Sequence, residues 1–188
     1  SVALPRWQDV VAYEEKDPTC MDLLKAIYPR FGLNPLVNEI AQKALKRHGL
    51  PRSTAWPYST ISAARKAQLH CQKMEQLATT TIIEVDGIIC LIADQKASPH
   101  AKAFWQHTGL GASSRQAAIA IGLEHPSSTY QGNKAREILR QRLGKIYHCN
   151  AELVQLHPSG MAALTTALET IKRMGFNKPS LQLGFPYV

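Results

Sequence analysis

Residues 152–175 constrain the fold of this chain more than any other stretch. A short apolar run turns through Pro158, Ser159 and Gly160 into an apolar helical stretch. A strand, a glycine-containing turn and a helix in this order predict an α/β fold. Such a turn directs unpaired backbone N–H groups and the positive end of the helix at one point, which is a natural place for a phosphate. The alternative is that Gly160 serves only to make the turn.

The chain after this helix predicts one more short strand, over residues 180–184. Strand, helix and strand are then arranged as at the beginning of a parallel sheet. Two parallel strands and one helix cannot cover both faces of such a sheet. We therefore expect the C-terminal region to be the opening of a larger domain that further chain completes.

Upstream, the sequence predicts several helices and one hairpin. Asn34 and Pro35 open a helix with one apolar face, and Gly49 ends it. Between residues 80 and 93, β-branched residues on both sides of Asp86-Gly87 predict two strands joined by a tight turn. Further helices are expected over 60–77, from Ser98 to a stop within 107–111, from Ser113, and over 133–143.

Composition and cysteine usage favour a cytoplasmic protein. The 188 residues suffice for one domain or one and a half. No apolar run reaches about eighteen residues, so no membrane span is expected. The start has neither an initiator methionine nor a signal-peptide layout, which indicates a trimmed or processed polypeptide. Cysteines occur far apart, without a Cys-x-x-Cys pair, so we expect reduced and mostly buried thiols at Cys20, Cys71, Cys90 and Cys149.

The charge and histidine patterns exclude several other functions. The net charge of +8 comes from 22 basic and 14 acidic residues, but the basic residues are spaced as on solvated helix faces. No recognition-helix or RNA-platform signature accompanies them, so no nucleic-acid partner is expected. The seven histidines lack metal-ligand spacing, and we expect no metal site. His157 and Ser159 lack the Gly-x-Ser-x-Gly context of a hydrolase.

Several short motifs follow one another in a characteristic order. They are Leu4-Pro-Arg-Trp7, Tyr13-Glu-Glu15, Tyr28-Pro-Arg-Phe31, Phe104-Trp-Gln-His-Thr-Gly-Leu-Gly111, Ser113-Ser-Arg115 and Pro158-Ser-Gly-Met161. In this order they resemble the Cys/Met-metabolism branch of pyridoxal-phosphate enzymes of fold type I. The likeness is strongest to the cystathionine gamma-synthase-like proteins of fungal type, which have a long N-terminal region.

The resemblance implies two regions and a cofactor site. Residues 1–112 would be an N-terminal α/β extension, and residues 113–188 the incomplete start of the large domain that binds pyridoxal 5'-phosphate. Ser159, Gly160 and Met161 would hold the cofactor phosphate. Tyr187 would stack on the pyridine ring, and Tyr130 would reach across a dimer interface into the neighbouring site. In the family that tyrosine belongs to a Tyr-x-Arg element, whereas here glycine stands two residues after Tyr130.

The reaction that the resemblance implies is a γ-replacement, in which cysteine or a related thiol displaces the acyl group of an O-acyl-homoserine. In the family the Schiff-base lysine follows the ring-stacking tyrosine, but every lysine here precedes Tyr187. No catalytic residue is therefore expected in this chain. The remaining C-terminal part would come from a separate or cleaved chain, or be missing from the polypeptide. The assembly would be a homodimer or tetramer, and its substrate would be an amino acid. The alternative is a non-catalytic regulatory or interaction subunit derived from that family.

Overall fold

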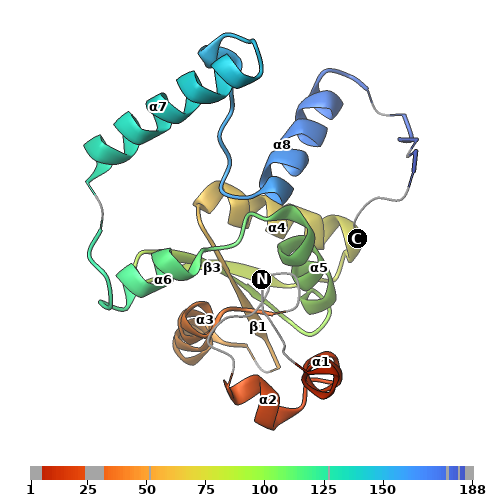
Figure 1. The fold of residues 1–188 in the computed structure, drawn as a ribbon. Coiled ribbons are helices and arrows are strands. Elements are labelled where there is room, and N and C mark those ends of the chain that lie inside the picture. Colours follow the sequence, from red (N-terminus) through yellow and green to blue (C-terminus); the bar gives the residue numbers. More distant parts are fainter. Residues whose placement is uncertain are drawn as a thin grey trace.

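The computed structural model describes residues 6–23, 32–50, 52–126, 128–176, 178–181 and 183–184. Its centre is a three-stranded antiparallel sheet in the order β1 (Thr54–Tyr58), β3 (Ile88–Ala93), β2 (Thr80–Val85), with helices on both faces (Figure 1). The expectation of a mixed α/β fold is thus confirmed for the N-terminal region. The sheet is antiparallel, and the parallel sheet of fold type I is not formed by the described residues.

The hairpin forms where the sequence predicted it. Asp86 and Gly87 join β2 to β3 with φ values of 50° and 80°. Two consecutive positive φ values are those of the two-residue turn whose twist matches that of the flanking strands. Lys43 and Arg47 donate hydrogen bonds to the two carboxylate oxygens of Asp86, over 3.4 and 3.2 Å. These contacts fix the hairpin turn to helix α3 (Pro35–His48).

Strand β1 was not predicted from the sequence. It contains Pro57, which has no N–H to donate to a sheet. Such a residue is tolerated because β1 lies at the edge of the sheet, where the side away from β3 forms only an isolated bridge between Tyr58 and Gly111 among the described residues. A five-residue strand interrupted by proline carries too weak a pattern to be recognised.

Both faces of β3 are buried, so the sheet separates two apolar layers. Successive strand residues face opposite sides, and Cys90 and Ile92 belong to one layer while Leu91 and Ala93 belong to the other. The first layer is completed by α3 and α6 (Ser114–Ala120). The second is completed by α4 (Ile61–Met74) and α5 (Ser98–Thr108). Two further helices, α1 (Trp7–Glu14) and α2 (Pro18–Leu23), contact each other.

Side-chain caps determine where the predicted helices begin. Asn34 accepts the Leu36 N–H at 3.0 Å, and Thr60 accepts the Ala63 N–H at 3.2 Å. Ser113 and Gln116 form a capping box at the start of α6. The predicted helix starts at 35, 98 and 113 are confirmed to within one residue. Helix α4 ends at Met74, three residues before the predicted end at 77.

Asp94 joins the end of β3 to the starts of two other elements. Its carboxylate accepts the Ala97 N–H at 2.8 Å and the Thr79 N–H at 3.1 Å. Burial opposes ionisation, but these N–H donors outweigh it and lower the pKa of Asp94 from its ordinary value of 3.8. The ionised form therefore stabilises the fold above about pH 4, and this contribution is lost as the pH falls through the folded-state pKa.

We expect Asp94→Asn to be less stable than the unmodified chain near neutral pH, with a difference that shrinks as the pH falls below about 4. Urea denaturation at several pH values measures this difference. The exposed Asp22→Asn variant is the control for a general effect of charge. A difference that stays constant with pH would contradict the assigned role of the Asp94 carboxylate.

The strands predicted near the C-terminus are wrong in the described residues. Residues 151–153 form the short 3-10 helix η1 (Ala151–Leu153), which Asn150 caps by accepting the Glu152 N–H. Residues 154–157, 180, 181, 183 and 184 belong to no strand. A parallel strand forms only beside a partner strand, and the described chain offers none at this place.

The predicted C-terminal helices do form. Helix α7 (Thr129–Ile146) begins four residues before the predicted start at 133, because Ser128 caps it. Helix α8 (Gly160–Arg173) follows the predicted turn. Helix α7 packs against η1, and α8 packs against the end of α5 and forms a side-chain ion pair with α4 (Figure 1). No helix in the described part of the chain is long and apolar enough to cross a bilayer.

Candidate anion-binding site

The predicted phosphate turn is the N-terminus of α8. Ser159 is extended, with φ −152° and ψ 161°, and its Oγ accepts the Ala162 N–H at 3.1 Å. The preceding N–H groups, of Gly160 and Met161, make no hydrogen bond to any residue that the structure describes. Ser159, Gly160 and Met161 are all exposed. The turn therefore presents two free N–H donors and the positive helix end to an approaching anion.

Gly160 is not required by the local backbone. Its φ is not positive, and a Cβ built on it would meet no described residue within 4 Å. The alternative that this glycine serves only to make the turn is therefore not supported, since any residue could adopt this conformation. The open space above Gly160 allows a ligand to approach the backbone directly.

The N-terminus of α8 packs against the end of α5. Gly109 ends α5 with φ +66°, and a Cβ there would lie 2.5 Å from Ser159 Oγ and 2.7 Å from the Ala162 nitrogen. The Ser159 hydroxyl also donates a long hydrogen bond, 3.5 Å, to the Gly109 carbonyl. The fold thus brings together two motifs of the sequence, residues 104–111 and 158–161. The sequence predicted the Gly109 segment as a helix end and as a motif of the resemblance, but not as a contact of the turn at 158–161.

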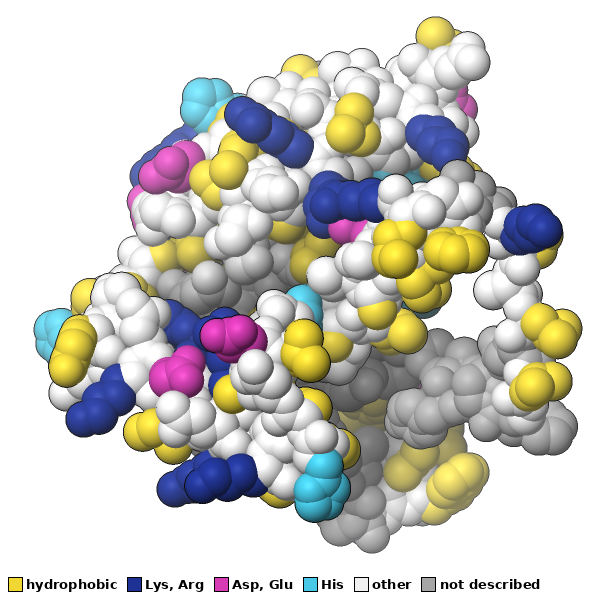
Figure 2. Space-filling model, turned by 90° about the horizontal axis from the view of Figure 1, so that it is seen from above, with side chains coloured by type: hydrophobic (Ala, Val, Ile, Leu, Met, Phe, Trp, Pro, Cys, Tyr) yellow, Lys and Arg dark blue, Asp and Glu magenta, His cyan; other side chains and the backbone are white. Residues whose placement is uncertain are grey.

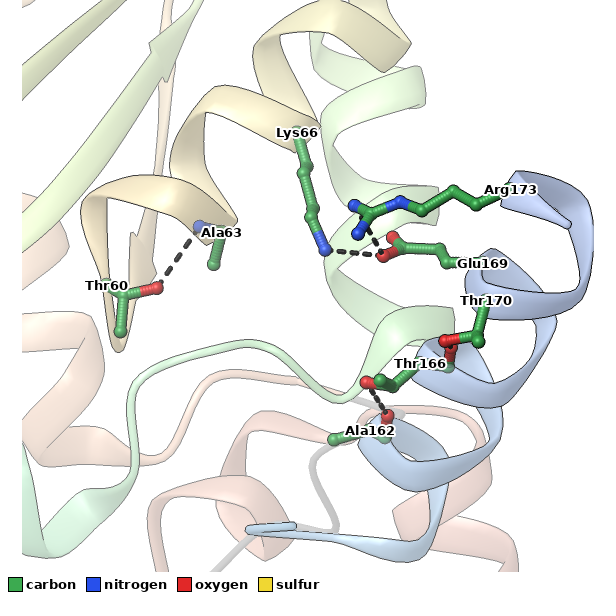
Figure 3. A network of polar contacts seen from close by, with 8 residues as sticks. All are labelled: Thr60, Ala63, Lys66, Ala162, Thr166, Glu169, Thr170 and Arg173. Atoms are coloured by element: carbon green, nitrogen blue, oxygen red, sulfur yellow. Dashed lines mark hydrogen bonds and ion pairs between the residues drawn. The ribbon is translucent and has the colours of Figure 1, made fainter. Parts of the chain in front are cut away.

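A second contact joins the middle of α8 to α4. Lys66 and Glu169 form an ion pair at 2.5 Å, and Arg173 approaches the same Glu169 oxygen at 4.0 Å (Figure 3). Within α8, Thr166 donates a hydrogen bond to the Ala162 carbonyl at 2.8 Å. The ion pair was not predicted, because Lys66 and Glu169 are separated by 103 residues along the chain.

A cavity of about 360 Å³ lies between α4, α5 and α8. Its walls combine apolar and basic side chains, including Phe104, Leu168, His107 and Lys172. His70 also lines it, and burial, followed by the neighbouring His100 and Lys73, lowers the pKa of this imidazole. Seen from above, this end of the molecule shows hydrophobic side chains interspersed with lysines and arginines (Figure 2).

Comparison with known proteins identifies a family that is similar to the region that contains α4 and α5. Residues 36–113 match the family described as the fungal trans-sulfuration enzyme, N-terminal domain. This part of the chain is therefore similar to that domain. We refer to the matched residues 36–113 as the trans-sulfuration domain. It contains all three strands, helices α4 and α5, and α3 from its second residue, and it includes both Gly109 and Lys66.

Curated relatives agree with this assignment. The chain is 26% identical to a cystathionine gamma-synthase of Neurospora crassa, over 65% of its own length and 24% of the relative. It is 23% identical to a cystathionine gamma-synthase of Saccharomyces cerevisiae, over 64% and 22%. A third relative, the L-2-amino-4-chloropent-4-enoate dechlorinase/desaturase of Streptantibioticus cattleyicolor, is 26% identical over 98% of this chain and 38% of its own length.

These alignments also show how much of a relative the chain represents. It spans between 21% and 38% of the length of the curated relatives that it matches. No solved structure matches the chain. The comparisons therefore show that the chain is similar to cystathionine gamma-synthases. The activity of a complete protein that contains this chain is proposed below.

Of the two predicted tyrosines, the structure describes Tyr130, which lies away from the turn of α8. Tyr130 lies in the first turn of α7, and 75% of its surface is exposed. Helix α7 begins well away from α8 (Figure 1) and makes no contact with it. A tyrosine that acts in a neighbouring subunit would have such an exposed position, and this role stays a prediction. Tyr187 lies outside the described residues.

All four cysteines are free, but their surroundings differ. Cys71 and Cys90 are buried, and burial raises the pKa of these thiols to about 11 and about 12. Cys149 is exposed, so the expectation of mostly buried thiols is wrong for this residue. Among the described residues, no group of three His, Cys, Asp or Glu could hold a metal ion.

We expect iodoacetamide at about pH 8 to alkylate Cys149 first, because only exposed thiols with accessible thiolate react quickly. Cys71 and Cys90 should react only when the domain unfolds, and addition of urea should make all four cysteines react. Mass spectrometry of digested samples taken over time measures the order. Modification of Cys90 as fast as Cys149 under native conditions would contradict the buried position of β3.

Proposed function

We propose that this chain is part of a pyridoxal-phosphate-dependent transsulfuration enzyme, in which the turn at Ser159, Gly160 and Met161 holds the cofactor phosphate. The observation that supports this most directly is the turn itself. Two N–H donors are free, the glycine between Ser159 and Met161 has open space above it, and the family of the adjoining domain is a trans-sulfuration family.

The residues of the turn fit a phosphate group. A phosphate needs several donors converging on its oxygens, and the N–H groups of Gly160 and Met161 supply them with the positive end of a 14-residue helix. The Ser159 hydroxyl already accepts the Ala162 N–H, and its own proton is held only by the long bond to Gly109. That proton can be redirected to a phosphate oxygen without loss of the helix cap.

When bound, the cofactor supplies an electron sink that stabilises carbanions of an amino-acid substrate. The part of this chain in that chemistry is to bind and orient the phosphate end. We propose that Tyr187 orients the pyridine ring and that Tyr130 reaches the neighbouring site across a dimer interface. The Schiff-base lysine would come from a C-terminal part beyond Val188, within a homodimer or tetramer.

The substrate that we propose is an amino acid with a leaving group on its γ carbon. The word gamma in the name cystathionine gamma-synthase refers to this carbon. The dechlorinase is named for an amino acid with chlorine on C4, which is the same carbon. We therefore propose γ-replacement, in which the sulfur of cysteine or a related thiol bonds to C4 of an O-acyl-homoserine as the carboxylate leaves.

A second candidate is a non-catalytic regulatory or interaction subunit derived from the same family. The observation that favours it is that the family match covers residues 36–113 and does not include the turn at Ser159, Gly160 and Met161. This subunit would use the trans-sulfuration domain for association alone.

The experiment that separates the two candidates uses the complete native protein that carries this chain. A catalytic assembly should absorb at the edge of the visible range, lose this band on borohydride reduction, and form cystathionine from an O-acyl-homoserine and cysteine. Reduction should leave a phosphopyridoxyl group on one lysine, which mass spectrometry locates. A colourless, fully assembled protein without activity would refute the proposed enzyme and favour the regulatory subunit.

A further inference from the structure

Helix α8 is attached to the rest of the molecule by few contacts. Ala162 is its one buried residue among those described, whereas Leu164, Leu168 and Ile171 each remain about half exposed. A helix with so little buried surface is not oriented by a core of its own. Its position therefore depends on the specific contacts near its start and its middle.

Both contacts come from the trans-sulfuration domain. At the start, the turn of Gly109 touches the N-terminus of α8 so closely that only hydrogen fits where a side chain would be, 2.5 Å from Ser159 Oγ. In the middle, Lys66 holds Glu169 (Figure 3). Ala162, whose backbone nitrogen is part of the first contact, is fully buried.

The two contacts restrict different motions. The Gly109 contact sets the distance between the ends of α5 and α8, because a side chain at position 109 would collide with Ser159 and with the backbone of Ala162. The ion pair lies two to three turns further along and sets the direction of the helix. A shift at Gly109 would displace the cap, and with it the N–H groups of Gly160 and Met161.

We infer that Gly109 and Lys66 are positioning residues, through which the trans-sulfuration domain holds the phosphate-binding turn in place. This inference rests on the proposed function of that turn. It gives the N-terminal domain a role in cofactor affinity although none of its residues would touch the cofactor. Gly109 does this by having no side chain, and Lys66 by its ion pair with Glu169.

The matched variants are Gly109→Asn and Gly122→Asn. Both glycines follow a helix and have positive φ, 66° and 80°, which asparagine tolerates better than most residues. A Cβ at position 122 meets nothing within 4 Å, whereas one at position 109 collides with Ser159 and Ala162. The pair therefore separates displacement of the turn from the backbone cost of replacing a glycine.

The probe is pyridoxine 5'-phosphate, which has no aldehyde and cannot form imines with lysines. It is titrated into the 188-residue chain while NMR follows the amide signals of Gly160 and Met161, and pyridoxine without phosphate serves as the control ligand. We expect Gly109→Asn to weaken phosphate-dependent binding at least about tenfold, with Gly122→Asn unchanged. Amide exchange at Ala162 and Ala163 should accelerate only in Gly109→Asn.

A second pair of variants tests Lys66. Lys66→Glu should also weaken binding, and the exchanged pair Lys66→Glu with Glu169→Lys should restore it, because the ion pair is re-formed in reverse. A merely destabilising effect of Lys66→Glu would not be rescued in this way. Circular dichroism and melting temperatures identify any variant that fails to fold, and the exchanged pair then carries the test.

Three outcomes are distinguishable. Equal binding by the two asparagine variants, together with no rescue by the exchanged pair, would overturn the positioning role. If the unmodified chain shows no phosphate-dependent shift at Gly160 and Met161, the anion site of the proposed function is refuted, and the positioning role is refuted with it. Selective loss in Gly109→Asn and rescue by the exchanged pair support both.

Discussion

Replacement of Leu91 by alanine will lower the free energy of unfolding by about 3 kcal/mol. Leu91 is fully buried on the central strand, opposite Trp56 on one side and Ile82 on the other. Removal of its side chain leaves a cavity in the layer beneath α4 and α5, and the two paired strands cannot both move to fill it. Urea denaturation followed by circular dichroism measures the loss.

The same substitution at Leu69 is the control for this prediction. Leu69 lies on α4, and 65% of its surface is exposed, so Leu69→Ala should change the free energy of unfolding by less than about 0.5 kcal/mol. Equal losses from the two substitutions would contradict the position of β3 as the buried centre of the sheet. A small loss from both would do so as well.

The parts of the fold that the sequence predicted are those determined by local chemistry. Asp86-Gly87 specifies its turn because both residues must adopt positive φ, and Asn34 and Ser113 specify helix starts because their side chains accept the first free N–H groups. Ser159 caps α8 in the same way. For each of these, the residues that determine the structure are at most three positions apart.

The parts that were missed depend on distant residues. Strand β1 exists because β3 offers it an edge, despite Pro57. The apolar run at 152–157 does not form a strand because no described strand lies beside it, although its pattern is that of a strand. Gly109 and Ser159 are 50 residues apart along the chain, and no local pattern of the sequence predicts their contact.

The candidate site shows the same division. The N-terminus of a helix at Gly160 was predicted, since a turn and a cap are local. Its support by Lys66 and Gly109 was not, because that depends on how α8 lies against the trans-sulfuration domain. The glycine at position 109 could have indicated a close approach. Many helices, however, end with a glycine of positive φ, as Gly109 does, only because this conformation ends the helix.

Replacement of Gly160 by aspartate should strongly weaken phosphate binding while it preserves or raises stability. The carboxylate would stand at the first position of α8, where a negative charge interacts favourably with the helix end by about 0.3 to 1 kcal/mol. It would also occupy the free N–H groups and repel a phosphate dianion. We expect the affinity for pyridoxine 5'-phosphate to fall at least about 100-fold, because each 1.4 kcal/mol of repulsion and lost hydrogen bonding changes the affinity tenfold.

Gly160→Asn is the matched control, since asparagine has the shape of aspartate without its charge. A Cβ at this position meets none of the residues that the structure describes within 4 Å, so neither variant should disturb the fold. Asparagine should therefore weaken phosphate binding far less than aspartate, and the melting temperature of the aspartate variant should be at least as high. Opposite changes in stability and affinity from one substitution indicate a ligand, because a residue that serves only the fold would change both together. Equal affinities for the aspartate and asparagine variants would show that no anion binds at the N-terminus of α8.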